Sequence, residues 1–92
     1  MHSSVSTRFR KNLRALRKAR GWTQEATAEK CGIGYKLFQL YELGIKQNPG
    51  LITLEKLADG FGLDVSQLLA PHLPKMAFRA GSVRRAAAKR KR

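Results

Sequence analysis

The sequence predicts an all-α fold of five short helices followed by a basic C-terminal tail. Apolar residues recur every three or four positions along most of the chain, and glycine or proline interrupts each such segment. The alternation of apolar and polar residues that marks a half-buried strand is missing. A chain of 92 residues supports one small domain. We expect an N-terminal arm over 1–7, the helical domain over 8–70 and a tail over 71–92.

The first helix is predicted to run to about Arg20, with Ser6 or Thr7 as its N-cap. Gly21 follows at a position where helices commonly end. The apolar stripe of this helix consists of Phe9, Leu13 and Leu16.

Two short helices and a tight turn come next. Thr23 is the expected N-cap of a helix over 24–31, and a third helix is expected over 35–43, ended by Gly44. The turn over 32–34 begins with a glycine, which can take the positive φ that such a turn requires. A capped helix, a glycine-containing turn and a second helix are the parts of a helix-turn-helix.

The last two helices are expected at about 52–61 and 65–69. Asp64 and Gln67 have the spacing of a capping box for the second of them, and Pro71 breaks the pattern that follows. The inward positions of the fourth helix are Leu54, Leu57, Ala58 and Phe61.

The chain carries 19 Lys and Arg against 6 Asp and Glu, a formal charge of +13. This charge is divided unevenly, with +7 over 1–20, −2 over 21–70 and +8 over 71–92. Such a charge favours a polyanionic partner, either nucleic acid or an anionic lipid surface. The basic flanks therefore predict affinity, whereas any sequence preference must come from the slightly acidic centre.

Several other classes of protein are disfavoured. A single cysteine, Cys31, excludes an internal disulfide framework, and its helical spacing is typical of a small buried side chain. His2 and His72 lie in terminal or linker segments, and the ligand spacing of a metal site is missing. Apolar runs stay far below the roughly 20 residues of a membrane span. We expect a cytoplasmic protein that is not an enzyme and needs no cofactor, metal or small-molecule ligand.

The segment TQEATAEKCGIGYKLFQLYELG, with LRALRKARGW before it and NPGLITLEKLADGFGLDVSQLL after it, resembles the Cro/repressor-type (xenobiotic-response-element-like) helix-turn-helix domain. The resemblance covers about residues 9–69. It implies a five-helix domain that regulates transcription by placing its third helix in the major groove of double-stranded DNA, as a homodimer on a two-fold site. The elements that carry the resemblance most specifically are Arg17, Gly21, 23–25, Ala28, Gly32, Glu42, Gly44, 48–49 and 53–58.

The exposed face of the third helix is expected to contact bases. On a helical wheel this face lies opposite Phe38 and Tyr41. A lysine there can donate to guanine, a glutamine can pair with adenine, and a leucine can contact a thymine methyl group. The candidates for base contact are Tyr35, Lys36, Gln39 and Leu40.

Phosphate contacts are expected from the first helix, the start of the second helix and the loop after the third. The resemblance also implies a partly buried salt bridge between Arg17 and Glu42, which would tie the first helix to the third. The candidates for phosphate contact are Arg10, Arg14, Arg17, Thr23, Gln24, Lys46, Gln47 and Asn48.

Two alternatives remain open at this point. Leu40, Leu43 and Ile45 give the third helix an apolar surface, which would suit a protein-interaction module of antitoxin or coactivator type. Alternatively, the basic tail could drive non-specific electrostatic binding to nucleic acid. Candidates for the dimer interface are Leu51, Leu63, Val65, Leu68 and Leu69.

Overall fold

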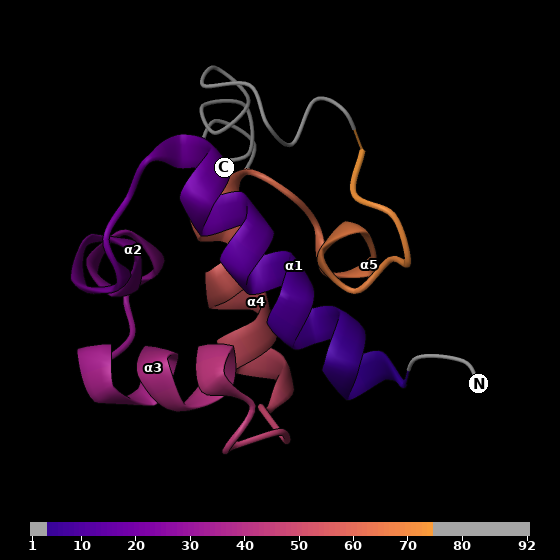
Figure 1. The fold of residues 1–92 in the computed structure, drawn as a ribbon, viewed down its shortest axis with the longest axis horizontal. Helices are drawn as coiled ribbons and strands as arrows, with labels where there is room; N and C mark the ends of the chain where they lie inside the picture. The colour runs from indigo at the N-terminus through magenta and orange to yellow at the C-terminus, as the bar shows by residue number, and fades with distance from the viewer. Residues whose placement is uncertain (1–3, 75–92) are drawn as a thin grey trace.

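The computed structural model describes residues 4–74, which form five α-helices and no strand (Figure 1). The all-α prediction is therefore confirmed, while the basic tail beyond Pro74 lies outside the described residues. Between residues 4 and 74, no helix is long and apolar enough to cross a membrane. The helices are α1 (Val5–Arg20), α2 (Gln24–Cys31), α3 (Tyr35–Leu43), α4 (Leu51–Phe61) and α5 (Val65–Leu68).

The helices pack around α1 and α4. In Figure 1, α2 and α3 lie on one side of α1, α5 lies on the other, and α4 passes behind α1. Both α1 and α2 contact α3, and α4 contacts α2 and α5. The second and third helices therefore form one edge of the molecule, with α1 and α4 supporting them from within.

The first helix starts earlier than predicted. Ser4 is its N-cap, and the hydroxyl of Ser4 accepts a hydrogen bond of 3.2 Å from the backbone N–H of Thr7. The prediction of a cap at Ser6 or Thr7 was wrong because several hydroxyl residues stand close together and each has the chemistry of a cap. Residues 4–7 of the expected arm therefore form the cap and first turn, which leaves Val5 51% exposed.

The remaining helix ends agree closely with prediction. Thr23 caps α2 by accepting from the N–H of Ala26 at 3.0 Å. Asp64 and Gln67 form the expected capping box, with both bonds at 3.0 Å. The fourth helix starts at Leu51, one residue earlier than expected, and α5 ends one residue earlier.

A single hydrophobic core contains side chains from all five helices. Leu63 and Leu68 belong to this core, with exposed fractions of 4% and 0%, so their assignment to a dimer interface was wrong. The physical reason is that Leu68 of α5 and Leu63, in the connection before α5, both turn into the core where α5 packs on α1 and α4. The buried apolar residues are Phe9, Leu13, Leu16, Ala28, Cys31, Phe38, Tyr41, Leu54, Leu57, Ala58, Phe61, Leu63 and Leu68.

A buried polar side chain of α1 holds the end of α5. Asn12 is 8% exposed, and its amide nitrogen donates to the carbonyl oxygens of Leu68 at 2.7 Å and Ala70 at 3.0 Å. The guanidinium of Arg8 donates to the carbonyl of Leu69 at 3.1 Å. The last carbonyls of a helix have no partner within it, so these side chains supply the missing donors.

Two close contacts fix α2 against the rest of the core. A Cβ atom on Gly60 would lie 3.0 Å from the Cα of Cys31, so this glycine allows α2 and α4 to approach closely. Trp22, in the connection between α1 and α2, stacks on Phe61 with ring centroids 5.6 Å apart and an interplanar angle of 15°. The helix-turn-helix segment is thus anchored at both ends of α2.

Candidate nucleic-acid interface

The turn between α2 and α3 is short and satisfied internally. Gly32 takes a φ of 75°, and the N–H groups of Gly32 and Ile33 donate to carbonyls of the last turn of α2. Thr27 is fully buried, and its hydroxyl donates to the carbonyl of Thr23 at 2.8 Å. The hydroxyl of Thr27 is thus satisfied within α2 and its cap, so this side chain can be buried without an unpaired polar group.

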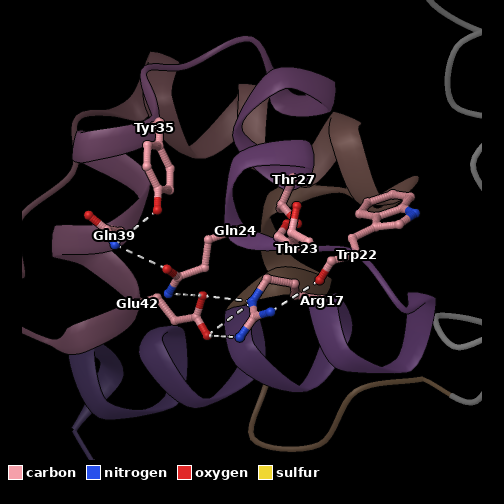
Figure 2. A network of polar contacts seen from close by, with 8 residues as sticks. All are labelled: Arg17, Trp22, Thr23, Gln24, Thr27, Tyr35, Gln39 and Glu42. Atoms are coloured by element: carbon pink, nitrogen blue, oxygen red, sulfur yellow. Dashed lines mark hydrogen bonds and ion pairs between the residues drawn. The ribbon is translucent and has the colours of Figure 1, made fainter.

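An ion pair fixes the far end of α3 to α1. Arg17 and Glu42 form the salt bridge that the resemblance implied, with Nη2 to Oε2 at 2.8 Å and Nε to Oε1 at 2.9 Å. The side chains are 15% and 1% exposed. The remaining terminal nitrogen of Arg17 donates to the carbonyl of Trp22 at 3.1 Å. One guanidinium therefore connects α1, the junction before α2 and the last turn of α3 (Figure 2).

From the ion pair a chain of hydrogen bonds leads to the surface (Figure 2). The amide nitrogen of Gln24 donates to Glu42 Oε1 at 3.2 Å. The amide nitrogen of Gln39 donates to Gln24 Oε1 at 3.2 Å and to the Tyr35 hydroxyl at 3.3 Å. We call Glu42, Gln24, Gln39 and Tyr35 the amide relay, because it links a buried carboxylate to the exposed face of α3.

The predicted base-contacting residues share one face of α3 but differ in exposure. Tyr35 and Lys36 are exposed, Tyr35 by 45%. Gln39 and Leu40 are only half-buried, since Gln39 lies against Gln24. The opposite face carries the core residue Phe38. Of the four predicted base-contacting residues, the two in the first turn of α3 are therefore the more exposed.

Cationic and amide side chains gather at the C-terminal end of α3. Arg10 is exposed on α1, and its side chain lies over Gly44, where an added Cβ would come within 2.7 Å of Arg10 Cδ. The loop residues Lys46, Gln47 and Asn48 are exposed, and the Gln47 amide donates to the carbonyl of Gly44 at 2.9 Å. Residues of α1 and of the loop are thus brought together beside the end of α3.

The other phosphate candidates occupy different settings. Arg14 is exposed on α1, and Thr23 is exposed at the cap of α2. Gln24 is half-buried within the amide relay. Arg17 has most of its donor capacity occupied by Glu42 and Trp22. Arg14 and Thr23 are therefore accessible to a phosphate, whereas Gln24 and Arg17 bond mainly to other groups of the protein.

Sequence reasoning missed two features of the domain outside the predicted contact residues. Asn12 was not singled out, because a polar residue within an amphipathic helix gives no sign of the carbonyls it meets. Ile52 is 69% exposed beside Leu51 at 77%. Its neighbours three and four positions on, Glu55 and Lys56, indicate a solvent-facing side of α4 and could have revealed it.

Comparison with known proteins agrees with this geometry. A helix-turn-helix family model matches residues 13–68, which include all of α2 and α3. The chain is 37% identical over 62 residues to the cryptic phage CTXphi transcriptional repressor RstR of Vibrio cholerae. That match covers 67% of this chain and 55% of RstR, so the chain spans little more than half of its relative. No solved structure matches significantly. The chain belongs to the Cro/repressor-type helix-turn-helix family.

Proposed function

We propose that this protein is a sequence-specific DNA-binding transcriptional repressor that places α3 in the major groove. The observation that carries the proposal is the position of Tyr35 and Lys36, which project from a helix whose other face is fixed to α1 through Glu42. Membership of the family and similarity to a protein named as a transcriptional repressor support a regulatory role. A helix held rigidly in this way can present base-contacting side chains at the same depth on every encounter.

Base recognition is assigned to Tyr35, Lys36, Gln39 and Leu40. The Lys36 ammonium group can donate to guanine O6 and N7, and Leu40 offers an apolar surface to a thymine methyl group. Because Tyr35 and Lys36 are the more exposed pair, they are the first to meet the floor of the groove.

Phosphate contacts come from two groups of residues beside the recognition helix. Near its C-terminal end lie Arg10 and the loop over 46–48, and Arg14 continues this cationic surface along α1. Thr23 and Gln24 stand at the N-terminus of α2, whose N–H groups favour an anion. Arg17 contributes mainly by holding Glu42 in place.

A homodimer in the cytoplasm is part of the proposal. Leu51 and Ile52 expose two large apolar side chains at the start of α4, which supports an interface there. Val65 and Leu69 are half-buried and remain candidates for the same interface. Two-fold symmetry of the protein would then be matched by two half-sites about one helical turn of DNA apart.

Selection of bound sequences from a random duplex pool tests this function. We expect a two-fold repeated motif, with a log–log salt slope of about −7 if the dimer neutralises roughly 8 phosphates. Lys36→Ala should remove most of the preference for the motif over a scrambled duplex at fixed salt. Lys56→Ala is the matched control, because Lys56 is an exposed lysine on α4 that is not among the proposed DNA-contacting residues. Equal losses on motif and scrambled DNA for Lys36→Ala would refute specific recognition.

A second candidate function is a protein-interaction module. Leu43 and Ile45 favour it, since they are 58% and 68% exposed at the end of α3. DNA selection decides between the two, because an interaction module would enrich no motif. Purely electrostatic binding is tested by deleting 75–92, which leaves Leu73 packed against the core. Loss of all binding in that variant would favour the electrostatic alternative over specific recognition.

A further inference from the structure

The amide relay has a fixed direction because it begins at a carboxylate. Glu42 is 1% exposed and paired with Arg17, and an ionised carboxylate can only accept hydrogen bonds. The amide of Gln24 must therefore turn its NH₂ group toward Glu42, as it does at 3.2 Å. The opposite orientation would bring two acceptors together in a half-buried site, which is costly.

This orientation is passed on to Gln39. With its NH₂ group toward Glu42, Gln24 presents its oxygen to α3, and Gln39 must donate to it. The amide nitrogen of Gln39 carries two hydrogens, and its contacts with Gln24 and the Tyr35 hydroxyl use both. Among residues 4–74, no group donates to the oxygen of Gln39. That oxygen is therefore the polar atom that Gln39 can offer to a ligand.

The Tyr35 hydroxyl is left as a donor, opposite in role to the Gln39 oxygen. Its oxygen accepts from Gln39, so its hydroxyl hydrogen is directed elsewhere and can be donated. The exposed end of the relay thus combines a donor on Tyr35 with an acceptor on Gln39.

We infer that Glu42 sets the polarity of the Gln24 and Gln39 amides, so that α3 recognises an exocyclic amino group in the major groove. This inference rests on the proposed function. Adenine N6 and cytosine N4 are the amino groups of that groove, whereas guanine and thymine place oxygen acceptors there. Adenine also has N7 as an acceptor for the Tyr35 hydroxyl, which makes it the preferred base. Gln39 then contacts the amino group of the base through its oxygen alone, while both hydrogens of its amide stay within the relay.

Glu42 and Gln24 act in this scheme as positioning residues. Neither needs to touch a base, yet each limits which way the Gln39 amide points. A glutamine without the relay can rotate its amide and accept or donate with similar ease. The relay therefore fixes whether Gln39 presents its oxygen or its NH₂ group to a base.

Base analogues in the selected duplex test the inference with the full chain. At each half-site position, adenine is replaced by purine, which lacks the N6 amino group, and cytosine by 2-pyrimidinone, which lacks the N4 amino group. Dissociation constants are measured by fluorescence anisotropy at fixed salt. At one position the wild-type protein should lose about tenfold or more in affinity. The analogue that causes the loss identifies adenine or cytosine as the source.

Three variants separate polarity from simple contact. Gln39→Met should bind the analogue and the parent duplex equally. Gln24→Met keeps the Arg17–Glu42 pair but frees Gln39 to rotate, so the ratio of the two dissociation constants should fall by about threefold or more. Gln47→Met is the matched control, because the Gln47 amide donates to the carbonyl of Gly44 and is not a member of the amide relay. It should weaken binding to both duplexes equally.

Each outcome supports or overturns the inference. The inference would be overturned if Gln24→Met kept the wild-type ratio of the two dissociation constants. It would also be overturned if no amino-group replacement, at any position, weakened binding by the wild-type protein. Either result would leave the proposed function intact. A motif whose Gln39-dependent position is guanine or thymine would overturn it as well. Absence of any enriched motif would refute the proposed function and this inference together.

Discussion

Removal of the Glu42 carboxylate should destabilise the fold strongly. In Glu42→Ala the guanidinium of Arg17, whose side chain is only 15% exposed, loses its contacts at 2.8 and 2.9 Å. The Gln24 amide also loses its acceptor. Breaking a buried ion pair in this way costs about 3–5 kcal/mol, because the remaining charge is left buried without a partner.

That cost is large for a chain of this length. At about 0.05–0.15 kcal/mol per residue, the free energy of unfolding should be about 5–14 kcal/mol. A loss of about 3–5 kcal/mol corresponds to a fall in Tm of roughly 15–30 °C for a small domain. The variant should therefore be partly unfolded at temperatures where the wild-type protein is folded.

Urea denaturation followed by far-UV circular dichroism measures the effect. Glu55→Ala is the matched control, because Glu55 is exposed on α4, and its unfolding free energy should stay within about 0.5 kcal/mol of wild type. The double variant Arg17→Met/Glu42→Leu removes both charges and should recover most of the loss. If Glu42→Ala lay within about 1 kcal/mol of wild type, the ion pair would not stabilise the fold as described.

Three further changes probe buried contacts elsewhere in the domain. Gly60→Ala should cost about 1–3 kcal/mol despite the better helix propensity of alanine, because the new methyl group meets Cys31; an unchanged urea midpoint would contradict this. Asn12→Leu should cost about 1–3 kcal/mol by leaving two carbonyls at the end of α5 without their donor, whereas Lys11→Ala, an exposed neighbour, should be nearly neutral in the same assay. Burial raises the pKa of the Cys31 thiol to about 12 from an ordinary value of 9.0. The unfolded chain therefore loses this proton first, and stability should fall from about pH 9 to 12 by a component that Cys31→Ala lacks; parallel curves for the two proteins would show that Cys31 makes no such contribution.

The helices and their order follow from local signals in the sequence. Thr23 and the Asp64–Gln67 pair satisfy nearby N–H groups within one turn, so their roles depend on few neighbours and are confirmed. The start of α1 was missed, because Ser4, Ser6 and Thr7 compete for the same role and local chemistry does not rank them.

Features that depend on distant segments were harder to predict. Leu63 and Leu68 were assigned to an interface because a small domain need not bury every leucine, but the connection between α4 and α5 and α5 itself turn both into the core. The Arg17–Glu42 pair was expected from the resemblance to a family. The polarity of Gln39 was not, because it depends on a carboxylate that reaches it only through Gln24.

Trp22 gives the molecule an optical reporter at the junction of α1 and α2. It is the single tryptophan of the chain, its ring stacks on Phe61, and its carbonyl accepts from Arg17. Its emission therefore arises from one known place, in a residue whose carbonyl is hydrogen-bonded to the arginine of the Arg17–Glu42 ion pair. The indole itself lies against Phe61 of α4, Arg20 of α1 and Lys30 of α2, so its fluorescence reports, without an added dye, on how these three helices pack behind α3.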